Sequence, residues 1–233
     1  MNSPAPIVLV PGLNCSARIY SNQIARLWPF GTVTIANHTH GDEIASIARQ
    51  ILAAAPVRFA LAGYSLGGYV AFEMLRQAPE RIVKLALLAT SARPDSPEQT
   101  AVRRERIALA EAGQFDAILD RHFPVLVHST RRDDQTLYRL YVQMARENGA
   151  EIFVRHQRAI IRRADSRPDL AAIRCPTLVL VGDSDQVTPS DAAREMATGI
   201  AGSRLVVVPA CGHLVPLEQP AVVSEALVQW IEQ

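Results

Sequence analysis

The chain has 233 residues, of which 48% are hydrophobic and 20% charged, and its formal net charge is +1. These values are typical of a globular protein built from one large domain, with enough apolar material for a buried sheet. A charge this close to neutral provides no electrostatic basis for binding nucleic acid or an anionic membrane. The three cysteines, Cys15, Cys175 and Cys211, show no C-x-x-C spacing, which argues against a metal site and against a disulfide framework.

The start of the chain shows no pattern of a targeting segment. Residues 1–6 lead directly into an apolar strand pattern, without a basic region followed by an apolar one. No apolar stretch approaches the roughly 18–20 residues that a membrane helix needs. We therefore expect a soluble, cytoplasmic protein without a membrane partner, and the sequence leaves its oligomeric state open.

In the first part of the chain, apolar and β-branched runs predict four strands. They lie at 7–10, 33–36, 57–62 and 82–89. The last of these is apolar throughout, as in a strand that is buried on both faces of a sheet. Helical spacing predicts one helix from Asp42, acting as its N-cap, to about Ala55, and a second helix that ends near Gln77.

The pattern changes after Ser91. Residues 93–169 contain many arginines and acids at helical spacing and no convincing strand, and strands return at 177–181 and 205–208, each followed by a helix. This alternation predicts an α/β fold, with a mostly parallel sheet and helices on both faces. We expect residues 1–91 and 170–233 to form the core, and residues 92–169 to form a small helical lid inserted in the same domain before the strand at 177–181.

The segment Gly63-Tyr64-Ser65-Leu66-Gly67 matches the G-x-S-x-G pattern of a nucleophile elbow. It lies between a predicted strand and a predicted helix, which is the setting that the pattern requires. A sharp turn there would lift Ser65 above the sheet edge, at a helix N-terminus that favours developing negative charge. The alternative is that Ser65 only caps the helix, with the glycines serving a tight turn.

Four segments together resemble the α/β-hydrolase family in its usual chain order. They are Val8-Leu-Val-Pro-Gly-Leu, Gly63-Tyr-Ser-Leu-Gly-Gly, Pro176-Thr-Leu-Val-Leu-Val-Gly-Asp-Ser-Asp-Gln-Val-Thr-Pro and Cys211-Gly-His. The resemblance covers essentially the whole chain except the expected lid. It implies the α/β-hydrolase fold, with a serine, an acid and a histidine following one another along the chain.

A serine hydroxyl needs an adjacent base, which a third group must orient. His213 follows the predicted strand at 205–208 and so lies at the carboxyl edge of the sheet, although it could merely cap a loop. Asp183 and Asp185 compete for the third position, and the resembled pattern places Asp185 there. Asp183 would instead satisfy turn amides. We therefore expect Ser65 as nucleophile, His213 as general base and Asp185 as the orienting acid.

The negative oxygen formed when Ser65 attacks a carbonyl needs two preorganised donors. We expect the backbone N–H groups of Leu66 and Leu13 to form this oxyanion hole. Many members of the resembled family have histidine before the glycine of the first loop, where this chain has Pro11. The departure leaves backbone donation possible. Asn14 could assist, although a turn residue is the favoured interpretation of its side chain.

Two further patterns favour structural explanations. His38, His40 and Asp42 could suggest a metal site, but an edge loop with Asp42 capping the next helix explains them more simply. The arginine-rich tract 155–163 favours a solvated helix face, with the alternative that one or two of its arginines face the pocket. We expect neither a metal nor a cofactor.

These expectations, together with the resemblance, lead to a serine hydrolase that cleaves small carboxylic esters or lactones through an acyl-enzyme on Ser65. The expected partner is a small-molecule ester, lactone or related acyl substrate, which the sequence does not identify. One alternative is a cofactor-free lyase or a C–C bond hydrolase with the same triad. Another is a hydrolase-like receptor whose pocket only binds a ligand.

Overall fold

The core of the molecule is one six-stranded sheet with the order β2-β1-β3-β4-β5-β6, in which every neighbouring pair is parallel. The computed structural model describes residues 5–233, so the chain start from which we expect no targeting segment lies partly outside the described residues. The strands are β1 (Ile7–Val10), β2 (Val33–Ile35), β3 (Phe59–Tyr64), β4 (Ile82–Leu88), β5 (Thr177–Gly182) and β6 (Arg204–Val208).

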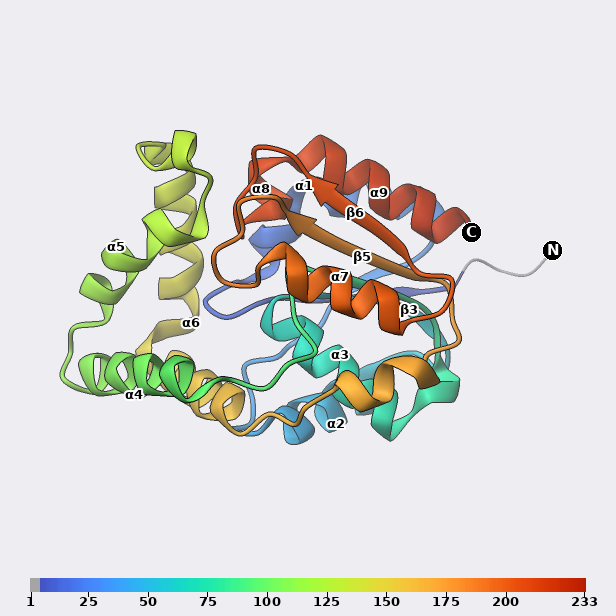
Figure 1. The fold of residues 1–233 in the computed structure, drawn as a ribbon, viewed down its shortest axis with the longest axis horizontal. Helices are drawn as coiled ribbons and strands as arrows, with labels where there is room; N and C mark the ends of the chain where they lie inside the picture. The colour runs from blue at the N-terminus through green and yellow to red at the C-terminus, as the bar shows by residue number, and fades with distance from the viewer. Residues whose placement is uncertain (1–4) are drawn as a thin grey trace.

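Helices cover both faces of this sheet, as Figure 1 shows. They are α1 (Ser21–Leu27), α8 (Val215–Glu218) and α9 (Pro220–Glu232) on one face, and α2 (Ile44–Ala54), α3 (Leu66–Gln77) and α7 (Ser190–Gly199) on the other. Alternate residues of β1 serve the two faces: Ile7 and Leu9 pack in the cluster with α1 and α9, and Val8 and Val10 in the cluster with α2 and α3. The predicted fold class, a parallel sheet with helices on both faces, is confirmed.

Three helices stand between β4 and β5 in the sequence. They are α4 (Pro97–Glu111), α5 (Phe115–Leu126) and α6 (Gln135–Ile161), and we call residues 97–161 the helical insertion. In Figure 1 the insertion lies beyond the ends to which the strand arrows point, so it faces the carboxyl edge of the sheet. Gly149, with φ of 82°, interrupts the helical geometry of α6. That the insertion acts as a lid stays a prediction.

Most element boundaries differ by one or two residues from those predicted, and two of the differences have a structural cause. β3 begins at Phe59 instead of residue 57, and Val57 lies outside the strand with an exposed fraction of 81%. At its other end, β3 continues to Tyr64, which pairs with Leu88 of β4. The expected N-cap role of Asp42 is wrong, because α2 is preceded by Glu43, whose side chain makes no capping hydrogen bond. The Asp42 side chain instead faces Arg162 of the loop after α6, at 3.6 Å.

No sequence pattern predicted the short elements. They are η1 (Ala17–Tyr20), α1, η2 (Trp28–Phe30), η3 (Pro79–Arg81), η4 (Ser129–Arg131), η5 (Arg167–Ala172) and α8. None of the helices in residues 5–233 combines the length and the apolar character needed to cross a membrane.

Candidate active site

Ser65 forms the sharp turn between β3 and α3. Its backbone has φ of 53° and ψ of −115°, a conformation that a residue with a side chain rarely adopts. Two hydrogen bonds hold it: the Ser65 N–H donates to the Leu88 carbonyl over 2.9 Å, and the Thr90 hydroxyl donates to the Ser65 carbonyl over 2.8 Å. These two hydrogen bonds, from the end of β4 and the residues that follow it, therefore fix the backbone conformation of the turn at Ser65.

The two glycines that flank this turn are required by close backbone approach. A Cβ atom at Gly63 would collide with the carbonyl of Gly67, and one at Gly67 would collide with the carbonyl of Val10 in β1. Glycine at both positions lets α3 start directly against the sheet, which places Ser65 at the carboxyl edge.

The structure brings Ser65, His213 and Asp185 together at that edge. His213 Nε2 lies 3.0 Å from Ser65 Oγ, and His213 Nδ1 lies 2.8 Å from Asp185 Oδ2. The three residues are buried, with exposed fractions of 9%, 4% and 5%. The Ser65 hydroxyl is therefore within hydrogen-bond reach of the imidazole, and the imidazole within hydrogen-bond reach of the carboxylate, so the ring can accept the hydroxyl proton while the carboxylate orients the ring.

Asp185 is held by its own loop. Its carboxylate accepts hydrogen bonds from the Val187 and Thr188 N–H groups and from the Thr188 hydroxyl, at 2.8 to 2.9 Å. Burial alone would raise the pKa of Asp185, but its interactions with His213 and Thr188 outweigh burial and leave the pKa below the ordinary value of 3.8. The carboxylate is thus ionised and fixed in direction.

Asp183 has different partners. Its carboxylate accepts the N–H groups of Ala210 and Cys211, at 3.0 and 3.2 Å, and the hydroxyl of Ser184. These contacts connect the end of β5 to the turn after β6, where two backbone donors need an acceptor. The structure therefore places Asp183 on turn amides and Asp185 on the His213 ring.

The loop that carries His213 is anchored from three sides. The N–H groups of His213 and Leu214 both donate to the carbonyl of Leu126, at the end of α5. The Tyr64 hydroxyl donates to the His213 carbonyl over 3.0 Å. The imidazole is consequently positioned by the helical insertion and by β3 as well as by its own strand.

Glu218 supplies the third anchor, and no sequence pattern pointed to it. Its buried carboxylate accepts the Gly212 N–H over 3.0 Å and the His128 N–H over 2.7 Å. Burial raises the pKa of Glu218 above its ordinary value, and the two backbone donors oppose that shift. Glu218 thus joins the His213 loop to the segment that follows α5.

The loop after β1 contains the expected oxyanion donor Leu13. The Gly12 carbonyl accepts hydrogen bonds from the Cys15 N–H and the His38 ring, at 3.1 Å each. Leu66 is the first residue of α3, so its N–H has no acceptor within the helix. The two groups come from neighbouring strand ends, β1 and β3, on the same edge of the sheet.

His38 is buried beneath this loop and takes part in no metal group. Its ring stacks on His156 with a centroid separation of 5.0 Å, and burial lowers the pKa of His38 to about 3. A neutral ring can donate Nε2–H to the Gly12 carbonyl, so His38 supports the loop that carries Leu13. His40 is exposed, and no group of three or more metal-ligating side chains occurs within residues 5–233.

Ser65 and His213 face a small cavity, about 70 Å³ in volume, between the sheet edge and the helical insertion. The insertion contributes Arg103 and Arg106 from α4, His122 and Leu126 from α5, and Tyr141 and Ile160 from α6. Burial, with the charges of the two arginines and of His213, lowers the pKa of His122 well below its ordinary value. His122 therefore contributes a neutral imidazole to the wall.

Sequence reasoning missed these insertion residues, because no motif marks them. The one available signal was the three-residue spacing of Arg103 and Arg106, which places both side chains on the same face of a helix. The tract 155–163 proved to have other contacts: Arg155 and Arg158 form ion pairs with Glu151 and Glu111. None of the arginines of this tract lines the cavity that contains Ser65.

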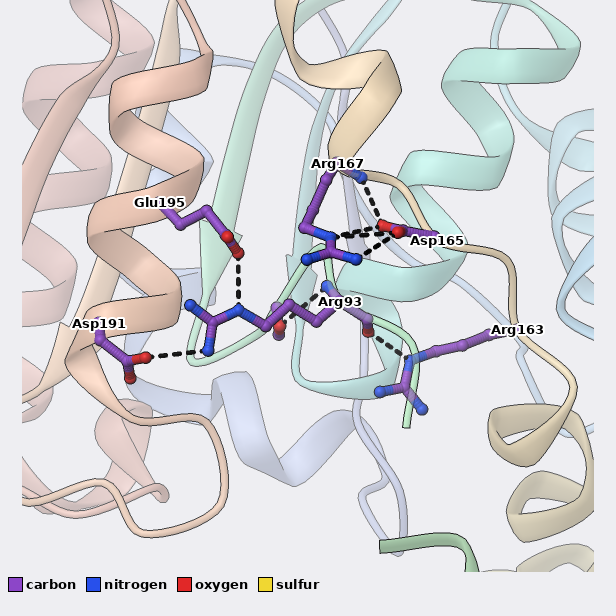
Figure 2. Close-up of polar contacts among 7 residues, drawn as sticks. Arg93, Arg163, Asp165, Arg167, Asp191 and Glu195 are labelled. Atoms are coloured by element: carbon purple, nitrogen blue, oxygen red, sulfur yellow. Dashed lines mark hydrogen bonds and ion pairs between the residues drawn. The ribbon is translucent and has the colours of Figure 1, made fainter. Parts of the chain in front are cut away.

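A second hollow adjoins the cavity and shares Tyr69 and Arg103 with it. We call this hollow the arginine groove; its arginines are Arg93, Arg103, Arg163 and Arg167. Figure 2 shows polar contacts of Arg93, Arg163 and Arg167. Each of the four groove arginines has a carboxylate partner: Asp191 and Glu195 for Arg93, Asp165 for Arg167, and Asp95, which Arg103 and Arg163 share. The groove is therefore a network of structural ion pairs.

Comparisons with known proteins show the family to which the chain is related. A model of the "Alpha/beta hydrolase family" matches residues 7–226. Among curated proteins, a pimeloyl-[acyl-carrier protein] methyl ester esterase from Nitrosomonas europaea is 28% identical over 180 residues, which cover 74% of this chain and 71% of that protein.

Two solved structures show the same fold. A thermophilic esterase from Thermogutta terrifontis, malate bound, matches with a TM-score of 0.87 and 30% identity, covering 98% of this chain and 89% of that one. An enol-lactonase from Burkholderia xenovorans LB400 matches with a TM-score of 0.90 and 23% identity, covering 100% and 93%. The second likeness concerns the fold alone.

Proposed function

The chain belongs to the alpha/beta hydrolase family, and on that premise we propose that it is a serine hydrolase that cleaves small carboxylic esters or lactones. The observation that carries this proposal is the path from Ser65 Oγ to His213 Nε2, at 3.0 Å, and from His213 Nδ1 to Asp185 Oδ2, at 2.8 Å. The esterases among the similar proteins support the choice of ester substrates.

In the proposed mechanism, His213 accepts the proton of Ser65 as the hydroxyl attacks the substrate carbonyl. The ionised Asp185 accepts a hydrogen bond from the Nδ1–H of the resulting imidazolium and stabilises this cation. The protonated imidazole then gives its proton to the leaving alcohol, and an acyl-enzyme remains on Ser65. Water activated by His213 attacks this acyl group and releases the acid, so these steps use only side chains and water.

The negative oxygen of each tetrahedral intermediate would lie between the N–H groups of Leu13 and Leu66. Leu13 lies in the loop after β1 and Leu66 begins the helix after β3, and the Gly12 carbonyl of the first loop already accepts hydrogen bonds from Cys15 and His38. Donors held in place before the reaction stabilise the developing charge without reorganising.

The helical insertion would act as a lid that closes the cavity over Ser65. Its side chains form much of the wall of the cavity, and the His213 loop is hydrogen-bonded to the Leu126 carbonyl at the end of α5. A covered site excludes bulk water and strengthens the electrostatic interactions within it. Its small volume suits a compact substrate.

A panel of para-nitrophenyl esters and lactones tests the proposal on the wild type, on Ser65→Ala and on Ser21→Ala, an exposed control. We expect Ser65→Ala to lose activity by about 10⁴-fold or more, and Ser21→Ala to remain active. A fluorophosphonate probe should also attach to Ser65, as mass spectrometry of the labelled peptide would show. Ester cleavage that survives intact in Ser65→Ala would overturn the mechanism.

A further inference from the structure

Arg103 and Arg106 both reach the cavity from α4, but their surroundings differ. Arg103 Nε lies 2.6 Å from Asp95 Oδ2, and Arg103 Nη1 donates to Gln157 Oε1 over 2.8 Å. Arg106 is half-buried and makes no ion pair or side-chain hydrogen bond with any residue in the range 5–233. Its guanidinium is a cation in the wall of the cavity without a counter-ion.

The arginine groove next to the cavity provides the contrast. Figure 2 shows Arg93 between Asp191 and Glu195, with Nη1 and Nε at 2.9 and 2.8 Å from the two carboxylates. Arg163 reaches Asp95 over 2.6 Å. The groove arginines therefore have carboxylate partners, whereas Arg106 has none among the described residues.

The other charged groups near the cavity do not neutralise Arg106. Asp95, with 1% of its side chain exposed, already serves both Arg103 and Arg163, and Asp185 is bonded to His213. Burial, followed by the charge of Arg103, lowers the pKa of Arg106. Tyr141 and Glu105 have the opposite effect on this pKa, but their effects are weaker. A partly buried cation in such surroundings gains more from an anionic ligand than an exposed cation does.

The hydroxyl of Tyr141 is a second unpartnered polar group in the same cavity. Tyr141 is only 2% exposed, and its hydroxyl makes no hydrogen bond of normal geometry with any described residue. Its polar neighbour is the side chain of Asn14, which also lines the cavity. Leaving a buried hydroxyl unpaired destabilises a protein. A hydroxyl can donate a hydrogen bond to an acceptor on a ligand, so its position beside the cavity points to such a ligand.

From these two observations we propose that Arg106 and Tyr141 form a subsite for a free carboxylate, and that the substrate is an ester or lactone carrying one near the bond that is cleaved. The subsite rests on the proposed hydrolase function. The planar guanidinium matches a carboxylate in two parallel hydrogen bonds, and the tyrosine hydroxyl can supply a further donor. The small volume of the cavity suits a compact anionic group.

Matched substrate pairs test the subsite. Mono-para-nitrophenyl glutarate and para-nitrophenyl hexanoate compare a charged with a neutral acyl group, and meta-acetoxybenzoate with its methyl ester makes the same comparison on the alcohol side. For at least one pair, we expect the wild-type kcat/KM for the charged ester to exceed that for the neutral ester by about 10- to 100-fold. Enzyme-free rates and those of Ser65→Ala correct for spontaneous hydrolysis.

The variants then assign the preference to residues. We expect Arg106→Met to bring the ratio of the two kcat/KM values close to one, Arg106→Lys to keep part of it, and Tyr141→Phe to lower it less than Arg106→Met does. Arg104→Met is the control, because Arg104 lies on the same helix, is exposed and does not line the cavity. It removes the same charge from the molecule and should leave the ratio unchanged.

Ligand binding separates this proposal from the hydrolase function. In the Ser65→Ala background, calorimetry should show that monomethyl glutarate binds at least about tenfold more tightly than dimethyl glutarate, and that Arg106→Met removes the difference. Equal binding of the two, or a difference that persists in Arg106→Met, would overturn the subsite even if esters are cleaved. Binding through Arg106 in a protein that cleaves no ester would overturn the hydrolase proposal and leave the subsite standing.

Discussion

At the scale of single residues, Asp183 and Asp185 differ by two positions and have separate sets of partners. Asp183 accepts the N–H groups of Ala210 and Cys211, whereas Asp185 reaches the ring of His213. Sequence resemblance favoured Asp185 as the orienting acid, and the contacts of both side chains support that proposal. The two carboxylates therefore allow a matched comparison of the same substitution.

We expect Asp185→Asn to lower kcat for ester hydrolysis by about 10⁴-fold, because an amide there favours the wrong tautomer of His213 and no longer stabilises its cation. Asp183→Asn should lower kcat less than about tenfold, since its loss affects a turn and not the imidazole. Steady-state kinetics with a para-nitrophenyl ester measures both. A larger loss in Asp183→Asn than in Asp185→Asn would show that the acid is misassigned.

The same carboxylate gives a prediction for stability in acid. The pKa of Asp185 in the folded protein lies below its ordinary value of 3.8, so its ionised form stabilises the fold above that pH. This contribution is lost as the pH falls through the lower folded-state pKa. We expect the unfolding free energy of the wild type to fall more steeply below pH 3.8 than that of Asp185→Asn, measured by urea denaturation. Parallel pH curves for the two proteins would contradict this.

At the scale of elements, the site depends on loops that other segments hold in place. Glu218 of α8 bonds to Gly212 beside His213 and to His128 after α5, and buried His38 bonds to the loop that carries Leu13. Neither Glu218 nor His38 contacts Ser65 in these bonds. Both are positioning residues for the proposed chemistry.

We predict that Glu218→Gln lowers the unfolding free energy by about 1–3 kcal/mol, because the amide can accept only one of the two backbone N–H groups and leaves the other unpaired. It should also lower kcat more than it changes KM, since the imidazole loses its orientation. Urea denaturation and ester kinetics measure the two effects. Glu80→Gln, at an exposed position, is the control; equal effects in both variants would rule out a positioning role for Glu218.

The boundaries of elements show what a local pattern cannot specify. β3 continues through Tyr64 because Gly63 and Tyr64 find backbone partners in the neighbouring strands at Val10 and Leu88. The apolar Val57 lies outside the strand and is exposed. Hydrophobicity suggested a strand in this region, and pairing with β1 and β4 decided where it begins and ends.

At the scale of the whole molecule, the helical insertion and the core share one hydrophobic cluster. Leu119, Phe123 and Tyr141 of the insertion pack in the cluster that contains Leu214 and the sheet residue Leu88. This shared burial is what an insertion within a single domain requires. The insertion also has a small cluster of its own, formed by Ala110, Ile118, Phe153 and Val154. That it belongs to the same domain as the core therefore stays a prediction.

The shared cluster predicts one cooperative unfolding transition. Trp28 and Trp230 both lie outside the insertion, and Trp230 is buried whereas Trp28 is 71% exposed. The change in fluorescence therefore reports mainly on the packing of Trp230 in α9, whereas far-ultraviolet circular dichroism also reports on the helices of the insertion. The two signals should give the same midpoint in urea. Loss of helical signal before any change in fluorescence would show that residues 97–161 unfold separately.

Much of the fold could be predicted, because strand and helix patterns depend on residues that are close in the sequence. The glycines around Ser65 indicated the turn, and alternating strands and helices indicated the parallel sheet. The wall of the cavity could not be predicted in this way. Arg106, His122 and Tyr141 come from three helices, and no local pattern states which of their faces meet.

The sequence by itself determined the class of the fold and the turn at Ser65, because short-range sterics and apolar periodicity act within a few residues. It also supplied the candidates for base and acid, through the family resemblance and their positions after predicted strands. Only the tertiary structure decided which groups are neutralised and which stay unpaired. Asp95 could be matched with Arg103 and Arg163 only in the folded chain, where segments 68 positions apart meet. Arg106 has no carboxylate partner among residues 5–233, and the sequence could not show this, since electrostatic partners are set by distance in space.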